Sequence, residues 1–351
     1  MRVVIKRDAT VVDEDGHVAG HDAGATLVRR FLRIFPESAV TGPGARRCDG
    51  FDMIPVDFVD PETMVVINMD VIDSMDVWNT IYKASGGKSP QIMNFVWWAP
   101  GTLTEQVQIA AFAMSCALFP TFSNSERTAN EVRELVSTNV KSFYAEQAKL
   151  AWVNLGFRLD HVQEREETAI PIVLYPAIYL NKVKQPEVFM SIMERVRKSV
   201  PIEVEMRLHE SSLVSEKAMA VGRKNWVWVG PLTVRRDSYW HALARTTAFV
   251  ATAVEESYGL SYVEAMGAGV IGIFPDRGWS RALLPDGYPF LYQSEEEAAD
   301  MLKRAVTDPD GCRAELDALV GGSFVKWIDE RHSDAAFDRE VRATVEKWFG
   351  A

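Results

Sequence analysis

The chain has few cysteines, and they form no pattern that would build a disulfide framework or a zinc site. Its 351 residues include three cysteines, Cys48, Cys116 and Cys312, which lie far apart and are odd in number. Small secreted domains pair closely spaced cysteines, and zinc sites cluster them. We therefore expect reduced thiols, no metal site and a cytoplasmic protein.

Long apolar runs and an excess of positive charge are also missing. The longest largely apolar stretch, 109–120, contains Ser115 and is too short to cross a bilayer. The first seven residues pass from an apolar segment straight into charge, which is not typical of a signal peptide. A formal net charge of −11 argues against a broad surface for nucleic acid or anionic lipid, although it leaves room for a local basic groove.

Apolar segments alternate with helical patterns along the whole chain, and this alternation predicts an α/β protein with parallel sheets. A chain of this length divides naturally into two domains of about 170 residues. We place the limits at 1–165 and 166–325, with the helices of 326–351, including Trp327, Trp348 and Phe349, packing back on the first domain. The clearest predicted strands are 64–68, 91–98, 117–121, 172–175, 202–208 and 226–232, and the clearest helices 74–84, 103–113 and 187–199.

One segment combines features of a ligand site. An apolar strand at 248–251 leads into an acidic loop that ends at Gly259, a short helical stretch and a second apolar run at 270–274. Glu256 and Glu264 stand eight positions apart in this segment. This layout is typical of a site at the carboxyl edge of a parallel sheet. Ser261 can cap the helix, the N–H groups from Tyr258 to Tyr262 can bind phosphate, and each carboxylate can accept hydrogen bonds from sugar hydroxyls.

Two other interpretations use the same residue types. Ser261 and Glu264 also match a capping box, in which the glutamate only closes the start of the helix. Asp13-Glu14-Asp15 matches the pattern of a metal-binding D-x-D motif, but Asp15-Gly16 after an apolar segment predicts a turn.

The segment 256–269 resembles the donor-binding signature of retaining GT-B glycosyltransferases of the group 4 type, an E-x7-E motif followed by a small-residue turn. The match includes Tyr258-Gly259-Leu260 and Glu264-Ala265-Met266-Gly267-Ala268-Gly269. The resemblance implies a GT-B fold, with two Rossmann-like domains facing a cleft. It also implies that Glu256 contacts the transferred sugar, Glu264 the ribose, and the amides around Gly259, Leu260 and Ser261 the diphosphate. Thr252-Ala253 stands where the family often has Pro-Ser.

Further donor-binding positions follow from the resemblance. Lys184, or Lys182 in a shifted register, matches the basic residue that reaches the diphosphate, although a solvated turn explains both lysines equally well. The family's Gly-Arg pair is absent before them, so Arg207 or Arg277 is a candidate for the second cation. Gly230 lies in the segment that matches the family's nucleobase pocket, and Gly24 lies in a loop that matches one near the diphosphate.

The resemblance therefore implies a glycosyltransferase that takes its sugar from a UDP- or GDP-sugar, needs no metal or other cofactor and retains the anomeric configuration. The sequence does not identify the acceptor; Trp97-Trp98 could stack on one, but a core position is the commoner use of such residues. The alternatives are a nucleotide-sugar epimerase, a phosphorylase-like enzyme of the same architecture, or a glycosyltransferase acting on a hydroxylated DNA base.

Overall fold

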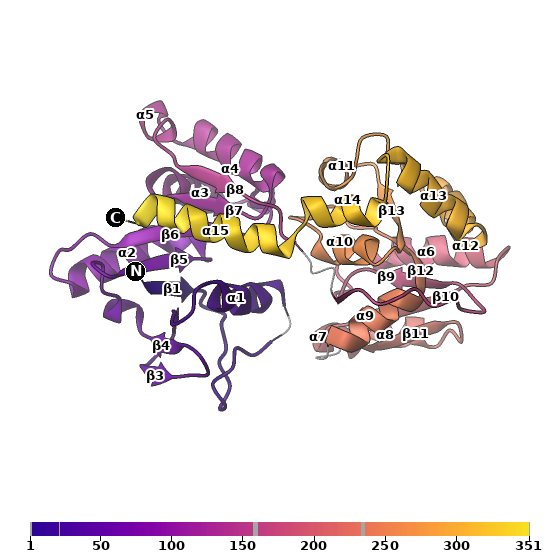
Figure 1. Ribbon diagram of the computed structural model, residues 1–351, viewed down its shortest axis with the longest axis horizontal. Helices are drawn as coiled ribbons and strands as arrows, with labels where there is room; N and C mark the ends of the chain where they lie inside the picture. Colours follow the sequence, from indigo (N-terminus) through magenta and orange to yellow (C-terminus); the bar gives the residue numbers. More distant parts are fainter. Residues whose placement is uncertain (1, 21, 157–160, 233–235, 351) are drawn as a thin grey trace. The chain divides into compact units, whose positions relative to one another are not determined.

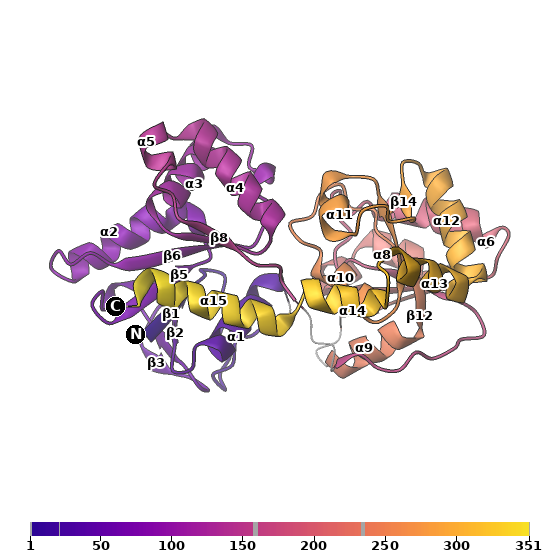
Figure 2. The same cartoon turned by 45° about the horizontal axis from the view of Figure 1, so that its top comes forward.

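The computed structural model describes residues 2–20, 22–156, 161–232 and 236–350 (Figure 1). They form two compact units, one made of residues 1–154 and 336–351 and the other of residues 155–335. Each unit is a parallel sheet with helices on its faces (Figures 1 and 2). In the part of the chain that is described, no helix combines the length and the apolar character needed to cross a membrane.

The first unit is built on an eight-stranded sheet in which every pairing except β3–β4 is parallel among the described strands. In spatial order the strands are β3 (Arg46–Arg47), β4 (Asp52–Ile54), β2 (Ala39–Thr41), β1 (Arg2–Lys6), β5 (Met64–Asn68), β6 (Gln91–Val96), β7 (Thr121–Ser123) and β8 (Leu150–Trp152). Its helices are α1 (Ala23–Ile34), α2 (Ser74–Ala84), α3 (Gln106–Leu118), α4 (Glu126–Asn139), α5 (Ser142–Ala145) and α15 (Asp334–Phe349).

Helix α15, at the end of the chain, packs on α1 (Figure 2). The ring of Phe337 lies 6.4 Å from that of Phe31 and 6.2 Å from that of Phe95. Asp338 accepts hydrogen bonds from Arg30 and Arg33 of α1, at 3.0 and 2.9 Å. The carboxyl-terminal segment therefore completes the core of the first unit.

The second unit has a six-stranded sheet whose described pairings are all parallel. Its spatial order is β11 (Val227–Pro231), β10 (Glu203–Leu208), β9 (Ile172–Tyr175), β12 (Thr246–Val250), β13 (Ile271–Pro275) and β14 (Leu291–Tyr292). Its helices are α6 (Pro186–Arg197), α7 (Glu210–Leu213), α8 (Glu216–Gly222), α9 (Arg236–Arg245), α10 (Leu260–Gly267), α11 (Gly278–Leu283), α12 (Glu295–Thr307), α13 (Pro309–Leu319) and α14 (Phe324–Arg331).

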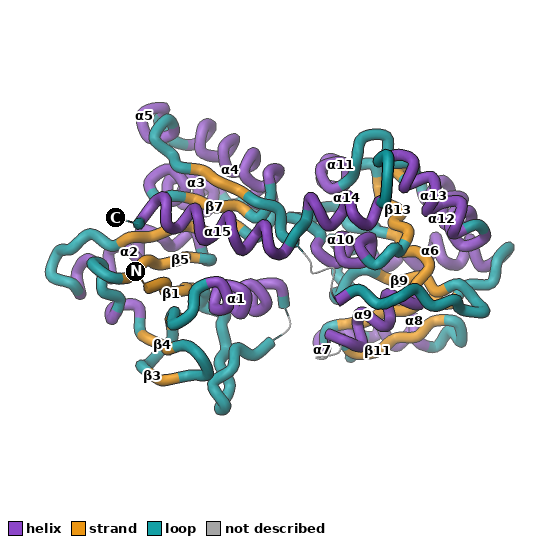
Figure 3. The backbone as a smooth tube through the Cα atoms, in the orientation of Figure 1, coloured by secondary structure: helices purple, strands orange, loops and turns teal. Residues whose placement is uncertain are grey.

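The strand order of the second unit reverses between β9 and β12, its two central strands. From β9 the chain moves outward through β10 to β11, whereas from β12 it moves the other way through β13 to β14. In Figure 3, where strands are orange, β9 lies between β11 and β13. All residues of β9 and β12 are buried, as expected for parallel strands covered on both faces. Loops that leave the carboxyl ends of two such strands diverge and open a crevice where ligands bind.

Most predicted elements are confirmed, and the misses have local causes. The helix predicted at 103–113 begins only at Gln106, because a 3-10 turn at Pro100–Thr102 precedes it. The strand predicted at 117–121 is wrong, since Ala117 and Leu118 end α3 and β7 starts at Thr121. Helix α14 belongs to the second unit, where Trp327 stacks on Phe324 with ring centroids 5.8 Å apart. The domain limits at 165 and 325 stay predictions.

Candidate active site at the carboxyl edge of the second sheet

The crevice between β9 and β12 brings together two charged side chains that are far apart in sequence. Lys184 comes from the loop after β9, and Glu256 comes from the loop after β12. The Lys184 ammonium forms an ion pair with Oε1 of Glu256. Both side chains are largely buried, at 21% and 13% exposure. The sequence predicted both residues for the site, and the structure adds that they are direct partners.

Tyr262, in the first turn of α10, holds the same carboxylate from a second side. Its hydroxyl donates a hydrogen bond of 2.7 Å to Oε1 of Glu256. Burial, with the charge of Glu256, raises the pKa of Tyr262 well above its ordinary value, so the hydroxyl keeps its proton and stays a donor. The ring is fixed by stacking with Phe249 and Trp279 at centroid distances of 5.7 and 5.5 Å. Glu256 is therefore oriented before any ligand arrives.

The loops that carry Lys184 and Glu256 are tied to each other. The Thr252 hydroxyl donates to the carbonyl oxygen of Lys184 at 2.7 Å, and the Val254 amide donates to the carbonyl oxygen of Val183 at 2.8 Å. Thr252 stands where the resembling family often has proline, and its hydroxyl supplies by hydrogen bonding the stiffness that a proline ring would supply covalently. The departure from the family pattern therefore leaves the loop held in place.

Helix α10 starts at a glycine, not at a serine. Gly259 is the N-cap, in the left-handed region at φ 86°, and a Cβ there would lie 2.5 Å from the ring of Tyr262. The first amides to bond to the N-cap carbonyl are those of Tyr262 and Val263. The N–H groups of Gly259, Leu260 and Ser261 precede this bonding, and their expected contact with a diphosphate stays a prediction.

The capping role expected for Ser261 is wrong. Its hydroxyl donates to the carbonyl oxygen of Pro176 at 3.0 Å, which ties α10 to the loop after β9. Because Gly259 is the N-cap, Ser261 and Glu264 do not form a capping box, and that interpretation of Glu264 is excluded. Glu264 lies inside α10 and is 5% exposed. Its expected contact with a ribose stays a prediction.

Tyr258 uses its side chain to anchor the loop. Its hydroxyl contacts both the carbonyl oxygen of Leu155 and Nδ1 of His332. Burial, assisted by the charge of Arg331, lowers the pKa of His332 to about 4, so this imidazole is neutral at pH 7. Gly156 fits against the same segment, since a Cβ there would lie 2.2 Å from the carbonyl carbon of Ser333. The loop before α10 is therefore anchored to the first and the last chain segments of the second unit, at Leu155 and His332.

The other predicted cations lie in different surroundings. Arg207 pairs with Glu205 and lies 5.2 Å from the ring of Trp228. The Trp228 ring in turn covers Gly230, where a Cβ would lie 2.2 Å from the indole. Lys182 is exposed in the turn before Lys184. Arg277 follows β13 and lines a pocket beside Thr252.

Gly24, which was predicted to lie in a loop, lies in the first turn of α1 in the first unit, because the helix begins at Ala23. Asp22 is the N-cap and accepts from the Ala25 amide at 3.0 Å and from the Arg7 guanidinium at 2.9 Å. Arg7 lies so close over Gly24 that a Cβ there would be 2.3 Å from its Nε atom. Glycine is therefore needed at this position for the approach of Arg7.

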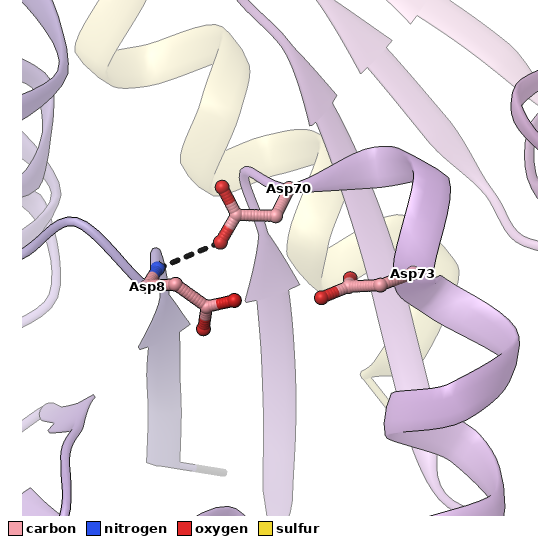
Figure 4. Close-up of side chains that lie close together, drawn as sticks. All are labelled: Asp8, Asp70 and Asp73. Carbon is pink, nitrogen blue, oxygen red and sulfur yellow. Dashed lines mark hydrogen bonds between the residues drawn. The ribbon is translucent and has the colours of Figure 1, made fainter. Parts of the chain in front are cut away.

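Three carboxylates gather at the carboxyl ends of β1 and β5 in the first unit (Figure 4). Asp8, Asp70 and Asp73 offer oxygens within 4.8 Å of one another, which is a spacing that a metal ion could use. The ammonium of Lys6 already pairs with all three. Burial alone would lower the pKa of Lys6, but hydrogen bonds to the aspartates outweigh it and the net pKa is raised.

The Asp13-Glu14-Asp15 segment forms the tip of a small hairpin. Val12 and Val18 form an antiparallel bridge, and the Asp13 amide donates to the His17 carbonyl at 2.9 Å. The turn interpretation of this motif is confirmed.

Comparison with known proteins shows similarity of structure without detectable similarity of sequence. No protein-family model and no curated protein sequence matches the chain. Among solved structures, sucrose-phosphate synthase from Thermosynechococcus elongatus aligns over 99% of both chains, with a TM-score of 0.72 and 11% identity. HepE of Anabaena in complex with UDP aligns over 99% of this chain and 100% of its own, with a TM-score of 0.72 and 11% identity.

A third structure extends the comparison. The α,α-trehalose-phosphate synthase (UDP-forming) from Burkholderia vietnamiensis aligns over 99% of this chain and 98% of its own, with a TM-score of 0.65 and 11% identity. The chain has the GT-B fold. The expected architecture of two Rossmann-like domains is thereby confirmed, and at these identities the comparison shows the fold alone.

Sequence reasoning missed the partners that hold the site together. Tyr262 was expected to offer only its amide, and Thr252 was noted only as a departure from a pattern. Both residues are buried next to polar loops, and a buried hydroxyl requires a hydrogen-bond partner. That requirement is the signal that could have found them, but it does not tell which residue across the sheet is the partner.

Proposed function

We propose that this protein is a retaining, metal-independent glycosyltransferase whose donor is a nucleotide-diphosphate sugar. The observation that carries the proposal is the Lys184–Glu256 pair at the strand-order reversal, next to the glycine-started helix α10. The crevice combines a cation, a carboxylate and the N-terminus of a helix. This combination suits a diphosphate bonded to a polyhydroxylated ring.

Donor binding would exchange the partners of this ion pair. The diphosphate would lie on the amides of Gly259, Leu260 and Ser261 and take over the Lys184 ammonium. Glu256 would then accept hydrogen bonds from hydroxyls of the transferred sugar, while Tyr262 keeps its carboxylate in place. Lys184 matters most as the leaving diphosphate gains charge, and the helix start adds positive potential at the same point. These groups supply the counter-charge that a metal ion would otherwise supply.

The solved structures of the same fold support a UDP-sugar as the first donor to test. HepE has been crystallised with UDP, with UDP and glucose, and with UDP-glucose, and the trehalose-phosphate synthase is described as UDP-forming. Glu264 is proposed to bind the ribose, and Gly230 to line the base pocket. A GDP-sugar stays in the test because no residue described above selects the base.

The test is release of UDP or GDP from a panel of UDP- and GDP-sugars, with and without EDTA. We expect slow nucleotide release from the correct donor, insensitivity to EDTA, and an α-linked product by NMR from an α-linked donor once an acceptor is supplied. Full loss of activity in EDTA with recovery in Mn²⁺ would contradict metal independence, and an inverted product would contradict retention.

The same assay separates the alternatives. An epimerase would change the sugar without releasing nucleotide, a phosphorylase would require inorganic phosphate, and a DNA-modifying enzyme would release nucleotide only with hydroxymethylated DNA. No nucleotide release and no nucleotide binding would overturn the proposal.

A further inference from the structure

A pocket of about 390 Å³ lies at the carboxyl ends of β12, β13 and β14, on the side of the sheet where α6 and α12 pack together. The Lys184–Glu256 pair does not line it. Polar side chains dominate its wall: Gln185, Thr252, Asp276, Arg277, Gln293 and Glu295. Tyr292, Val188, Pro275 and Ser294 line the rest of it. Ligand pockets begin at about 300 Å³, so this one suits a small metabolite.

Both carboxylates on this wall already accept hydrogen bonds within the protein. Asp276 accepts from Nε and Nη2 of Arg281, at 2.5 and 2.9 Å, and from Nε2 of Gln293 at 3.3 Å. Glu295 accepts from the Ser191 hydroxyl at 2.6 Å. Two hydroxyl donors are used as well: that of Tyr292 donates to the Ala251 carbonyl at 2.8 Å, and that of Thr252 to the Lys184 carbonyl at 2.7 Å. A ligand that presented mainly donors would therefore compete with existing bonds.

The donor side chains of Arg277 and Gln185 differ from those of Tyr292, Thr252 and Gln293, which already donate within the protein. Arg277 has no carboxylate partner within the described ranges, although Asp276 is its neighbour in sequence. Gln185 precedes α6 in the left-handed region, at φ 46°, and its side chain caps no amide of that helix. A guanidinium offers five N–H donors in a fixed fork that fits two oxygens of one anionic group. The missing partner is therefore an anion that presents acceptors.

We propose that this pocket is a binding site, separate from the donor diphosphate, for a monosaccharide-sized metabolite bearing a phosphate or carboxylate group. Arg277 binds the anionic group, and Gln185 hydrogen-bonds to it or to an adjacent hydroxyl. The ring of the ligand lies against Tyr292 and Val188. The proposal stands on the pocket itself and does not require the glycosyltransferase activity.

A matched ligand series tests the chemistry. Glucose, glucuronate and glucose 6-phosphate share one ring and differ only at the sixth carbon, so calorimetry on the full chain isolates the anionic group. We expect binding of glucose 6-phosphate, glucuronate or both, and at least tenfold weaker binding of glucose. Binding by one anion alone assigns the group. Equal binding of glucose, or no binding of any of the three up to 10 mM, a ceiling of roughly −3 kcal/mol, overturns the proposal.

Variants and a competition experiment test whether the anion binds in this pocket. Arg277→Gln should weaken the anion about 10- to 100-fold, because one charged pair of hydrogen bonds is lost. The control Arg304→Gln, whose arginine pairs with Glu315 away from the pocket, should leave binding unchanged. Glu295→Gln should tighten binding two- to threefold, since it removes a negative charge from the wall. Saturating UDP should not displace the anion; competition with UDP would assign Arg277 to the donor site and overturn the proposal.

Discussion

The carboxyl edges of the two sheets each hold a lysine, Lys6 buried and Lys184 partly buried, in opposite ways. In the first unit Lys6 is surrounded by Asp8, Asp70 and Asp73, so acidic groups outnumber the cation. In the second unit Lys184 pairs with one carboxylate among the described residues, that of Glu256, near the start of α10. Similar sheets thus carry an acidic edge in one unit and, in the other, the edge that we propose binds the donor diphosphate. A diphosphate suits only the second edge, and hydroxyl or cationic groups suit the first.

The largest effect is expected from removing Lys6. Lys6→Met would leave three carboxylates without their buried counter-charge and should cost about 3 kcal/mol of unfolding free energy. Urea unfolding measures this directly, and Lys88→Met, which breaks an exposed pair with Glu62, serves as the control with little change expected. If Lys6→Met is as stable as the wild type, the acidic edge is not held by this lysine.

The pH dependence of Lys6 adds a check on the same comparison. Its pKa is raised in the folded protein, so its stabilising contribution is complete below the unfolded pKa of about 10.4 and is lost as pH rises through the higher folded value. Unfolding free energy should therefore fall above pH 10 more steeply in the wild type than in Lys6→Met. Parallel curves would contradict this.

On the second edge, Lys184→Ala should lower kcat about 10²- to 10³-fold, as removal of one preorganised charge-stabilising donor does. Nucleoside binding should persist, because in the proposed site Lys184 binds the diphosphate and not the base or the ribose. Lys182→Ala, two positions earlier and exposed, is the matched control. If Lys182→Ala is inactive while Lys184→Ala stays active, the register assigned to this loop is wrong.

Part of this comparison could be predicted from the sequence, and part could not. Strand Ile172–Tyr175 and helix Ser74–Ala84 were predicted to the residue, because burial on both faces and helical periodicity are local patterns. The role of Ser261 was missed, because the helix start depends on the left-handed Gly259 and not on the serine. Partners such as Lys184 and Glu256 meet only through sheet order, which local patterns do not encode.

A smaller effect is expected at Glu264. Glu264→Gln should weaken UDP or GDP binding by ~1.5–3 kcal/mol, about 10- to 100-fold, because charged hydrogen bonds to two ribose hydroxyls become neutral ones. Calorimetry with the bare nucleotide gives the affinity, and a melting curve reports the fold. Unchanged affinity would show that this buried glutamate serves the structure alone.

The smallest effect is expected at Tyr262. Tyr262→Phe keeps the ring stack but removes the hydrogen bond to Glu256, which should cost about 1 kcal/mol, or roughly fivefold in kcat/KM for the sugar nucleotide. Affinity for bare UDP should stay the same. A loss of UDP binding would mean that Tyr262 positions the diphosphate site and not the sugar carboxylate.

The most direct test of the donor site is a pair of measurements on Glu256→Ala, with Glu255→Ala as the neighbouring control. Turnover of the sugar nucleotide should fall about 100-fold in Glu256→Ala, as loss of preorganised transition-state contacts predicts. Its affinity for bare UDP should be unchanged or higher, because Lys184 loses its competing partner. Glu255→Ala should change neither quantity appreciably. An inactive Glu255→Ala beside a fully active Glu256→Ala, or UDP binding lost in Glu256→Ala with turnover intact, would contradict the account.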